Sequence, residues 1–352
     1  MTTMAPDEVM PAQRLRSFAT AVLRTVGMPD DDADATANAM VWAELRDLPM
    51  HGVSGKLPQC VRRIKAGTTA ARSAWQAASE SPSTVVFDAQ NAWGQVSGVR
   101  AMRAAIARAH TQGVGIVVVR NSSSAAAMGH YASLAIEERM IGIAITNGPA
   151  LMPPPGGTTR VAGNQGFAVG APAGAHKPLL FDSALSLIST GEIHTAHERG
   201  EMLPPGLMLD VSGQPTIDPV AALAGLYVPI GGHRGFGLAL MWEVLTGVLS
   251  GGARFGADVG APDAYEKAQG VSHFFMAIDP AIAMPYEQFT TRVDALIDQV
   301  HASPPAAGVA RIYVPGERGY ETAERRSREG IPVAPKRLAT LRALADEVGV
   351  PW

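Results

Sequence analysis

The sequence predicts an α/β protein in which helices pack on a buried sheet. Short runs rich in β-branched residues, such as 115–120 (GIVVVR) and 141–146 (IGIAIT), alternate with longer Ala-rich stretches of helical character. Apolar residues make up 47% of the 352 residues, which is enough for a large core, whereas charged residues make up only 17%. This alternation of strand and helix patterns is typical of an α/β domain.

The elements follow in a readable order. Residues 8–45 predict two packed helices because Leu15, Phe18, Val22 and Leu23 recur at helical spacing and an Ala-rich stretch follows. After a loop, a further helix is expected at about 57–66, ended by Gly67. The pattern then predicts strands from residue 84, at 115–120, 141–146, 167–170, 179–182 and 273–279, and helices at 98–110, 124–139 and 235–250.

The two ends of the chain are expected to form one lobe. The last 40 residues become helical and charged again, so they are expected to pack on the first helices. The predicted domains are a helical lobe of residues 1–75, completed by 320–352, and an α/β region of 76–319 that binds cofactor and substrate.

Charge and cysteine content exclude several classes of function. Twenty-nine basic and 32 acidic residues leave a net charge of -3, which provides no electrostatic footprint for nucleic acid or an anionic membrane. We therefore expect a small-molecule substrate. The single cysteine, Cys60, allows no internal disulfide and favours a reducing compartment, so a cytoplasmic protein is expected. The uncharged stretch 140–159 is interrupted by four prolines, so a membrane span is not expected there.

Common motifs for cofactors and metals are missing from the sequence. There is no G-x-G-x-x-G between a strand and a helix, and GGHRGFG at 231–237 has a different spacing. H-E-x-x-H, C-x-x-C and G-x-S-x-G are absent too, and no metal site is predicted. Any cofactor site must therefore use another architecture.

His51 is the first candidate for chemistry. It lies in a predicted loop between helices, beside Gly52, and an imidazole whose pKa lies near neutrality is suited to donating a proton to a carbonyl oxygen. The alternative is an ordinary surface or capping histidine. Two other histidines, His130 and His273, are expected to be packing residues.

Three further sites have both a functional and a structural interpretation. Asn121-Ser122-Ser123-Ser124 follows a predicted strand and is expected to open a helix, where it would either cap the helix or bind phosphate. Asp182, at the end of a strand, would orient an imidazole, bind a ribose hydroxyl or cap a helix. His233-Arg234 begins an apolar helix, where it would bind an anion or form a solvated cationic cap.

Taken in order, several stretches resemble the malate/L-lactate dehydrogenase family of NAD(P)-dependent oxidoreductases. This family is distinct from the Rossmann-type lactate and malate dehydrogenases and includes sulfolactate, ureidoglycolate, diketogulonate and ketimine reductases. The resemblance runs from about residue 10 to the C-terminus. It is carried by HGVSGKLPQCVRRIKAG at 51–67, VVVRNSS at 117–123, TNGPALMPPPGG at 146–157, FDSALS at 181–186, LPPGLMLDVSGQPTIDP at 203–219, GGHRGFGLALMWEVLTGVLSGG at 231–252 and SHFFMAIDP at 272–280.

The resemblance implies a fold with a mixed sheet, a homodimer and a reductase that uses NAD or NADP. It implies that His51 donates the proton to the substrate oxygen or imine nitrogen and that Asp182 is its relay partner. The cofactor would be held by residues spread along the whole chain, namely Asn121, Ser122, Ser123, Ser124, Asn164, Ser183, Ser186, Asp218, His233, Arg234, Gly235 and Glu317. The expected reaction is reduction of a 2-oxo acid or cyclic imine, or oxidation of the corresponding 2-hydroxy acid.

Several positions depart from the family pattern. Met50 stands where relatives carry Ser before the histidine, Ser124 replaces a histidine, Glu192 replaces Lys, and Arg234 replaces Lys. The alternative is therefore a divergent member that keeps the scaffold but binds a ligand or catalyses another reaction. Residues 121–191 are also poor in charge, which predicts a dry, weakly polar pocket centred on His51 and Asp182.

Overall fold

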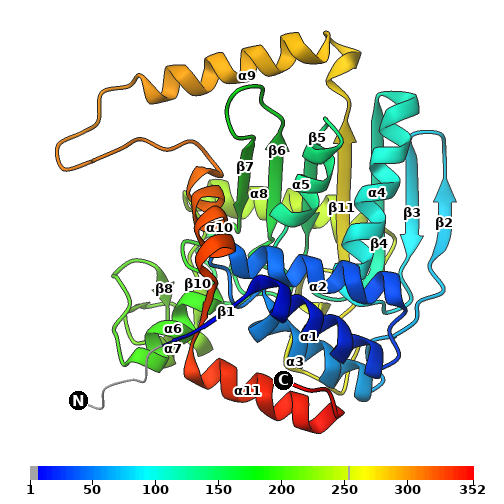
Figure 1. Ribbon diagram of the computed structural model, residues 1–352. Helices are drawn as coiled ribbons and strands as arrows, with labels where there is room; N and C mark the ends of the chain where they lie inside the picture. The colour runs from blue at the N-terminus through cyan, green and yellow to red at the C-terminus, as the bar shows by residue number, and fades with distance from the viewer. Residues whose placement is uncertain (1–6, 253) are drawn as a thin grey trace.

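A seven-stranded mixed sheet forms the centre of the protein, as the sequence predicts. The computed structural model describes residues 7–252 and 254–352. The strand order is β2-β3-β4-β11-β5-β6-β7, in which β3 and β4 run parallel and all other neighbours run antiparallel (Figure 1). The strands are β2 (Gln76–Glu80), β3 (Thr84–Asp88), β4 (Val114–Ser122), β5 (Ile141–Thr146), β6 (Phe167–Ala171), β7 (Leu179–Ser183) and β11 (Val271–Ile278).

Alternating side chains give the sheet two apolar faces. On β4, Val117 and Val119 join one core, whereas Val118 joins the other, because successive side chains of a strand point to opposite faces. The first face is covered by α4 (Gly94–Gln112) and α5 (Gly129–Glu137). The second is covered by α8 (His233–Glu243) and by the π-helical turn Val244–Val248 that continues it. The sheet is therefore buried on both sides.

The chain ends meet in a helical core of their own. This core is built from α1 (Ala12–Thr25), α2 (Asp30–Leu45), α3 (Val53–Lys65) and α11 (Pro335–Val348). The short strands β1 (Glu8–Met10) and β12 (Ile331–Val333) pair antiparallel and tie the two ends together. Because Trp93 and Val96 at the start of α4 also belong to this core, it is continuous with the sheet region. The domain boundaries expected near residues 75 and 320 stay a prediction.

Smaller elements surround these two cores. A three-stranded sheet of order β10-β8-β9 lies beside α6 and α7, while α9 and the loop after it extend away from the sheet (Figure 1). No helix in the two described stretches is long and apolar enough to cross a membrane. The remaining elements are α6 (Thr190–Arg199), β8 (Met208–Leu209), β9 (Pro215–Thr216), α7 (Pro219–Ala224), β10 (Leu226–Tyr227), 3₁₀ turns at Gly256–Asp258 and Pro280–Ile282, α9 (Tyr286–His301) and α10 (Glu317–Glu329).

One predicted helix is wrong at its start. The sequence predicts a helix at 124–139 opened by Asn121–Ser124, but α5 begins only at Gly129. The backbone of Asn121 has φ 54° and that of Ala126 has φ 65°, a left-handed conformation that interrupts a right-handed helix. The serines at 122–124 therefore do not form a helix N-terminus that binds phosphate.

Candidate functional site

A buried glutamate, Glu44, holds the loop that carries His51 by hydrogen bonds to Ser54. Glu44, near the end of α2, accepts hydrogen bonds at Oε1 from both the backbone N–H and the hydroxyl of Ser54, each at 2.9 Å. Gly52 lies directly over this carboxylate, where a Cβ would overlap the Glu44 side chain. The His51 N–H donates to the carbonyl of Leu48 at 2.9 Å, so the residue sits in a closed turn. His51 is thus held in place by its backbone.

His51 has a lysine for a neighbour. Its Nδ1 atom is buried and has no hydrogen-bond partner in the described part of the chain. Burial, and then the charge of Lys56, lower the pKa of His51 to about 4, so the imidazole is neutral at pH 7 in the free protein. An anion that binds Lys56 would offset the lysine charge and so make protonation of His51 more favourable.

Lys56 is a half-buried cation without a carboxylate partner among the described residues. Its Nζ donates to Gln59 Oε1 at 3.0 Å and to Ser124 Oγ at 3.3 Å. Burial, and then the charge of Arg63, lower the pKa of Lys56 to about 8, so it stays cationic at neutral pH. Sequence reasoning missed this residue, because what distinguishes it is a half-buried charge with no carboxylate beside it among the described residues, and that arises only from packing.

The four residues at 121–124 have different roles. The hydroxyl of Ser122 donates to Ser97 at 2.9 Å, and the hydroxyl of Ser123 accepts from the Gly94 N–H at 2.9 Å. Both serines therefore attach the start of α4 to the end of β4. Of the three serine side chains, the structure brings Ser124 to Lys56.

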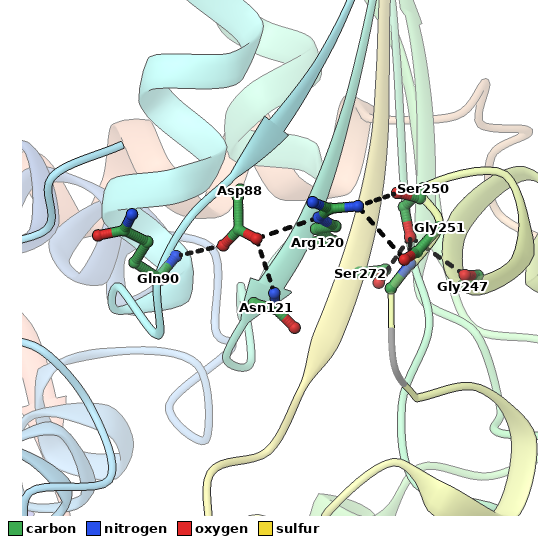
Figure 2. A network of polar contacts seen from close by, with 9 residues as sticks. Asp88, Gln90, Arg120, Asn121, Gly247, Ser250, Gly251 and Ser272 are labelled. Atoms are coloured by element: carbon green, nitrogen blue, oxygen red, sulfur yellow. Dashed lines mark hydrogen bonds and ion pairs between the residues drawn. The ribbon is translucent and has the colours of Figure 1, made fainter. Parts of the chain in front are cut away.

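Asn121 belongs to a polar network at the end of β3 and β4 (Figure 2). Its Nδ2 donates to Asp88 Oδ2 at 2.9 Å, and Arg120 Nε donates to the same carboxylate at 3.1 Å. Arg120 also reaches the carbonyl of Gly251 at 3.3 Å, so the network anchors the chain just after the π-helical turn. Asn121 thereby holds the neighbouring strands and the 250–252 segment together.

A strap of residues 261–269 lies against the candidate site. Arg63, fully buried on α3, donates to carbonyl oxygens of this strap at Ala261 (2.8 Å), Pro262 (3.0 Å), Ala264 (3.2 Å) and Lys267 (3.1 Å). Gln269 Oε1 then accepts from the backbone N–H of Ser124 at 3.1 Å. A guanidinium with several N–H donors suits such an array of carbonyls. The sequence contained no pattern from which this strap could be predicted.

Asp182 faces a different set of groups. Its Oδ2 accepts from the Gly129 N–H at 2.9 Å, at the start of α5. The side chain is exposed in the single chain, yet the protein atoms around its carboxyl displace enough water to raise its pKa to about 6, against the lowering effects of that N–H and of Arg46. No hydrogen bond joins Asp182 to His51 within the described residues.

A second group of predicted residues converges where β7 leads into α6. The carbonyl of Asn164 accepts from the Leu185 N–H at 2.6 Å, and the Asn164 amide donates to Ser186 Oγ at 3.4 Å. Ser186 bridges to Pro229, which leads into α8. The structure thereby brings Asn164 and Ser186 to the segment that leads into His233, Arg234 and Gly235, while the hydroxyl of Ser183 donates to the adjacent Ala184 carbonyl at 3.1 Å.

Two predicted cofactor residues lie in local contacts of their own. Asp218 is exposed and caps α7 by accepting from the Val220 N–H at 3.0 Å. Glu317 begins α10, accepts from the Val314 N–H at 2.9 Å and pairs with His301 at 3.1 Å. No hydrogen bond or ion pair of the described residues joins either of them to Ser186 or Lys56.

Comparison with known proteins identifies the family. The sequence profile described as malate/L-lactate dehydrogenase matches residues 10–342. The chain belongs to this family. Because the malate/L-lactate dehydrogenase family and the relatives of this chain are dehydrogenases and reductases of 2-hydroxy acids and cyclic imines, the protein is an oxidoreductase.

Three relatives show the range within the malate/L-lactate dehydrogenase family. The malate dehydrogenase of Pyrococcus horikoshii is 36% identical over 97% of this chain and 96% of its own. The Delta(1)-pyrroline-2-carboxylate reductase of Ancylobacter novellus is 31% identical over 92% and 93%. The solved structure of the sulfolactate dehydrogenase from Methanocaldococcus jannaschii superposes with a TM-score of 0.91 at 33% identity, covering 97% of this chain and 98% of that one.

The start of α8 fits the nicotinamide cofactor that the family implies. Gly231 and Gly232 are exposed with φ 59° and 63°, and a Cβ at Gly232 would meet no atom within 4 Å, so the backbone is open there. His233 and Arg234 follow, also exposed, at the end of the helix where free N–H groups and the helix dipole favour an anion. This combination of donors and positive charge suits a pyrophosphate.

Proposed function

We propose that the chain is an NAD(P)H-dependent reductase of a 2-oxo acid or cyclic imine, working in reverse as a dehydrogenase of the corresponding 2-hydroxy acid, with His51 as the proton donor. The observation that carries the proposal is the pairing of His51 with Lys56. Within the described residues, an imidazole nitrogen without a hydrogen-bond partner and a half-buried cation without a carboxylate partner lie together at the start of α3. A carboxylate next to a carbonyl or imine group complements both.

In this reaction the substrate carboxylate binds Lys56, and the reacting oxygen or nitrogen faces His51. The bound cofactor supplies the hydride. Burial is the larger cause of the low pKa of His51 and the Lys56 charge is the smaller one, so a carboxylate that neutralises Lys56 raises the pKa of His51 by removing the second cause. The imidazole can then hold a proton and donate it to the developing alkoxide or amine. Substrate binding therefore prepares the acid that the reaction needs.

Asn164, Ser183, Ser186, His233, Arg234 and Gly235 are proposed to hold the cofactor, with its pyrophosphate at the start of α8. Gly235 allows this start to lie close to the preceding turn, since a Cβ there would overlap the carbonyl of Ile230. Ser124 is proposed to act through Lys56. Asn121, Ser122 and Ser123 are proposed to hold β4 against its neighbouring elements through their side-chain hydrogen bonds. Cofactor binding by Asp218 and Glu317 stays a prediction.

Asp182 is proposed to act near the reacting centre as a relay group. Its pKa of about 6 lets it exchange a proton near neutral pH, and Arg46 keeps a positive charge beside it. A relay to His51 requires the substrate or a water molecule to bridge them, because the two side chains share no hydrogen bond.

We further propose a homodimer formed through α8. On this helix and its π-helical extension, six apolar side chains are exposed, namely Leu238, Leu240, Met241, Val244, Val248 and Leu249. An exposed apolar patch of this kind marks an interaction surface. A second copy offers the same patch, which is what a two-fold interface requires. Sedimentation analysis of wild type and a Met241→Glu variant tests this, and a monomeric wild type would contradict it. A cytoplasmic location also stays a prediction.

Binding and turnover test the proposal directly. Calorimetry with NADH and with NADPH is followed by assays with pyruvate, oxaloacetate and 1-pyrroline-2-carboxylate. We expect binding of at least one nucleotide and oxidation of it by at least one substrate. Failure to bind either nucleotide would overturn the proposal.

A divergent member that only binds a ligand is the second candidate. It is favoured by Met50, which supplies no hydroxyl beside His51, and by Glu192, whose carboxylate accepts from the Ser189 N–H at 2.9 Å in a capping box and so faces its own helix. Nucleotide binding without turnover of any substrate in the panel would support this candidate.

A further inference from the structure

Three parts of the chain meet beside His51. Met50, the residue before it, lies against Gly191 at the start of α6, where a Cβ would come within 2.8 Å of the Met50 side chain. Arg337, in the first turn of α11, places Nη2 3.2 Å from the Met50 sulfur. Lys336 pairs with Glu198 of α6 at 2.9 Å. The first turn of α11, which points toward α6 in Figure 1, therefore borders the His51 loop.

Arg337 is a half-buried cation whose fork of N–H donors is not used by a carboxylate in the described structure. Two glutamates are near enough to feel its charge, and both are engaged elsewhere. Glu44 accepts from Ser54, and Glu198 pairs with Lys336. Residues 1–6 and 253, which lie outside the described part of the chain, contain no Asp or Glu. Among the described residues, the Met50 thioether is the one hydrogen-bond contact of the Arg337 side chain, so this cation beside a binding site is positioned for an anion from outside the chain.

We propose that Arg337 binds a second acid group of the substrate and so makes the enzyme selective for 2-oxo acids that carry two acid groups. The inference rests on the proposed function, in which Lys56 binds the carboxylate next to the reacting carbonyl. Arg337 approaches the same loop from α11, which shares the helical core with α2 and α3, and its Nη2 contacts the sulfur of Met50, the residue before His51. A guanidinium matches a carboxylate or sulfonate through two parallel hydrogen bonds.

The phosphates of the cofactor are a second anion with which Arg337 could pair, so the experiment has to distinguish the cofactor from the substrate. Lys336→Gln is the matched control because Lys336 is the adjacent cation but is exposed and already paired with Glu198. Arg337→Gln removes the charge, and Arg337→Lys keeps it without the bidentate fork.

Steady-state reduction of oxaloacetate and pyruvate is measured for wild type and the three variants. We expect Arg337→Gln to lower the preference for oxaloacetate over pyruvate, as a ratio of kcat/KM, at least tenfold, mainly through KM. Arg337→Lys should recover part of the preference, and Lys336→Gln should keep it. Equal losses on both substrates would overturn the proposal. So would weaker NADH or NADPH binding with an unchanged preference, which would assign Arg337 to the cofactor.

A binding measurement separates this proposal from the proposed reductase function. The thermal shift caused by L-malate and by L-lactate is measured on the NADH-loaded wild type and on Arg337→Gln. If wild type turns over none of oxaloacetate, pyruvate and 1-pyrroline-2-carboxylate, the reductase function fails. The role of Arg337 is then decided by the thermal shift that L-malate causes beyond that of L-lactate. Loss of this difference in Arg337→Gln supports the role, and an unchanged difference refutes it. Unfolding curves of the unliganded variant show whether it folds.

Discussion

Replacing Lys56 with Met removes the cation beside His51 while keeping much of the side chain's length. The substrate carboxylate then loses a charge-assisted hydrogen bond, which is worth about 1.5–3 kcal/mol. Because about 1.4 kcal/mol corresponds to a factor of ten, kcat/KM should fall about 10- to 150-fold, mostly through KM. Ser124 Oγ and Gln59 Oε1 lose the group that they contact, so the site becomes less polar as well.

The pH profile makes the prediction more specific. The pKa of Lys56 is lowered to about 8, so its charge is present below pH 8 and is lost above it. Wild-type kcat/KM for reduction should therefore decline as the pH rises through about 8. In Lys56→Met this alkaline decline should disappear, because the group that titrates there is gone. The free His51 of the variant should also have a higher pKa than about 4, since the lysine charge no longer opposes its protonation.

The assay is initial-rate reduction of oxaloacetate between pH 5 and pH 10 with saturating cofactor. Lys65→Met is the matched control, because Lys65 lies on the same helix but is exposed and pairs with Glu347 at 2.6 Å. That control should keep the wild-type KM and profile. An alkaline decline that persists in Lys56→Met, or a KM that does not change, would refute the reasoning.

The remaining predictions concern His51, Arg63 and the buried histidines. His51→Ala should lower turnover about 100-fold or more while leaving nucleotide affinity nearly intact; equal loss of both in kinetics and calorimetry would indicate a structural role. Arg63→Met should lower the free energy of unfolding by at least about 1.5 kcal/mol and speed tryptic cleavage at Lys267, because the strap loses its charge-assisted hydrogen bonds. Arg63→Lys should have a free energy of unfolding and a cleavage rate between those of wild type and Arg63→Met. An unchanged cleavage rate in Arg63→Met would contradict the role of Arg63 in holding the strap. Burial lowers the pKa values of His130 and His273 to about 3, below the 6.5 of an unfolded chain, so the unfolded state binds more protons and stability falls as the pH drops below 6.5. Each should contribute up to about 1.4 kcal/mol per pH unit in urea unfolding, and a His130→Phe variant with the wild-type slope would argue against this.

The sequence by itself determined the class of fold and most of its elements. The β-branched runs at 115–120 and 141–146 became β4 and β5, and the helix predicted at 98–110 became α4, because these choices depend on local periodicity. Colinear motifs also carried the family, which the sequence profile confirms. The helix predicted from residue 124 begins only at Gly129. The hydroxyl of Ser123, which was expected to cap that helix, instead accepts from the Gly94 N–H, nearly 30 residues earlier in the chain.

Some residues of the candidate site could likewise be predicted from the sequence, and others could not. His51 could be singled out from its loop and its neighbouring glycine, since its turn is local. Lys56, Arg63 and Arg337 could not, because what distinguishes them is the absence of a nearby carboxylate or the presence of distant carbonyls. Those are properties of packing: Arg63 reaches residues almost 200 positions away, and Arg337 meets Met50 across the whole length of the chain.

The opening expectation of a dry, weakly charged pocket changes for the same reason. The sequence located the shortage of charge at 121–191, but the tertiary structure brings the charge of Lys56 on α3 to Ser124 in that region, and the charge of Arg337 on α11 to the residue before His51. A local pattern determines which residues form a helix or a strand, whereas a binding site is made of groups from separate elements. Burial by those elements then sets the pKa values of Lys56 and His51, and only the folded chain decides which charges are buried together.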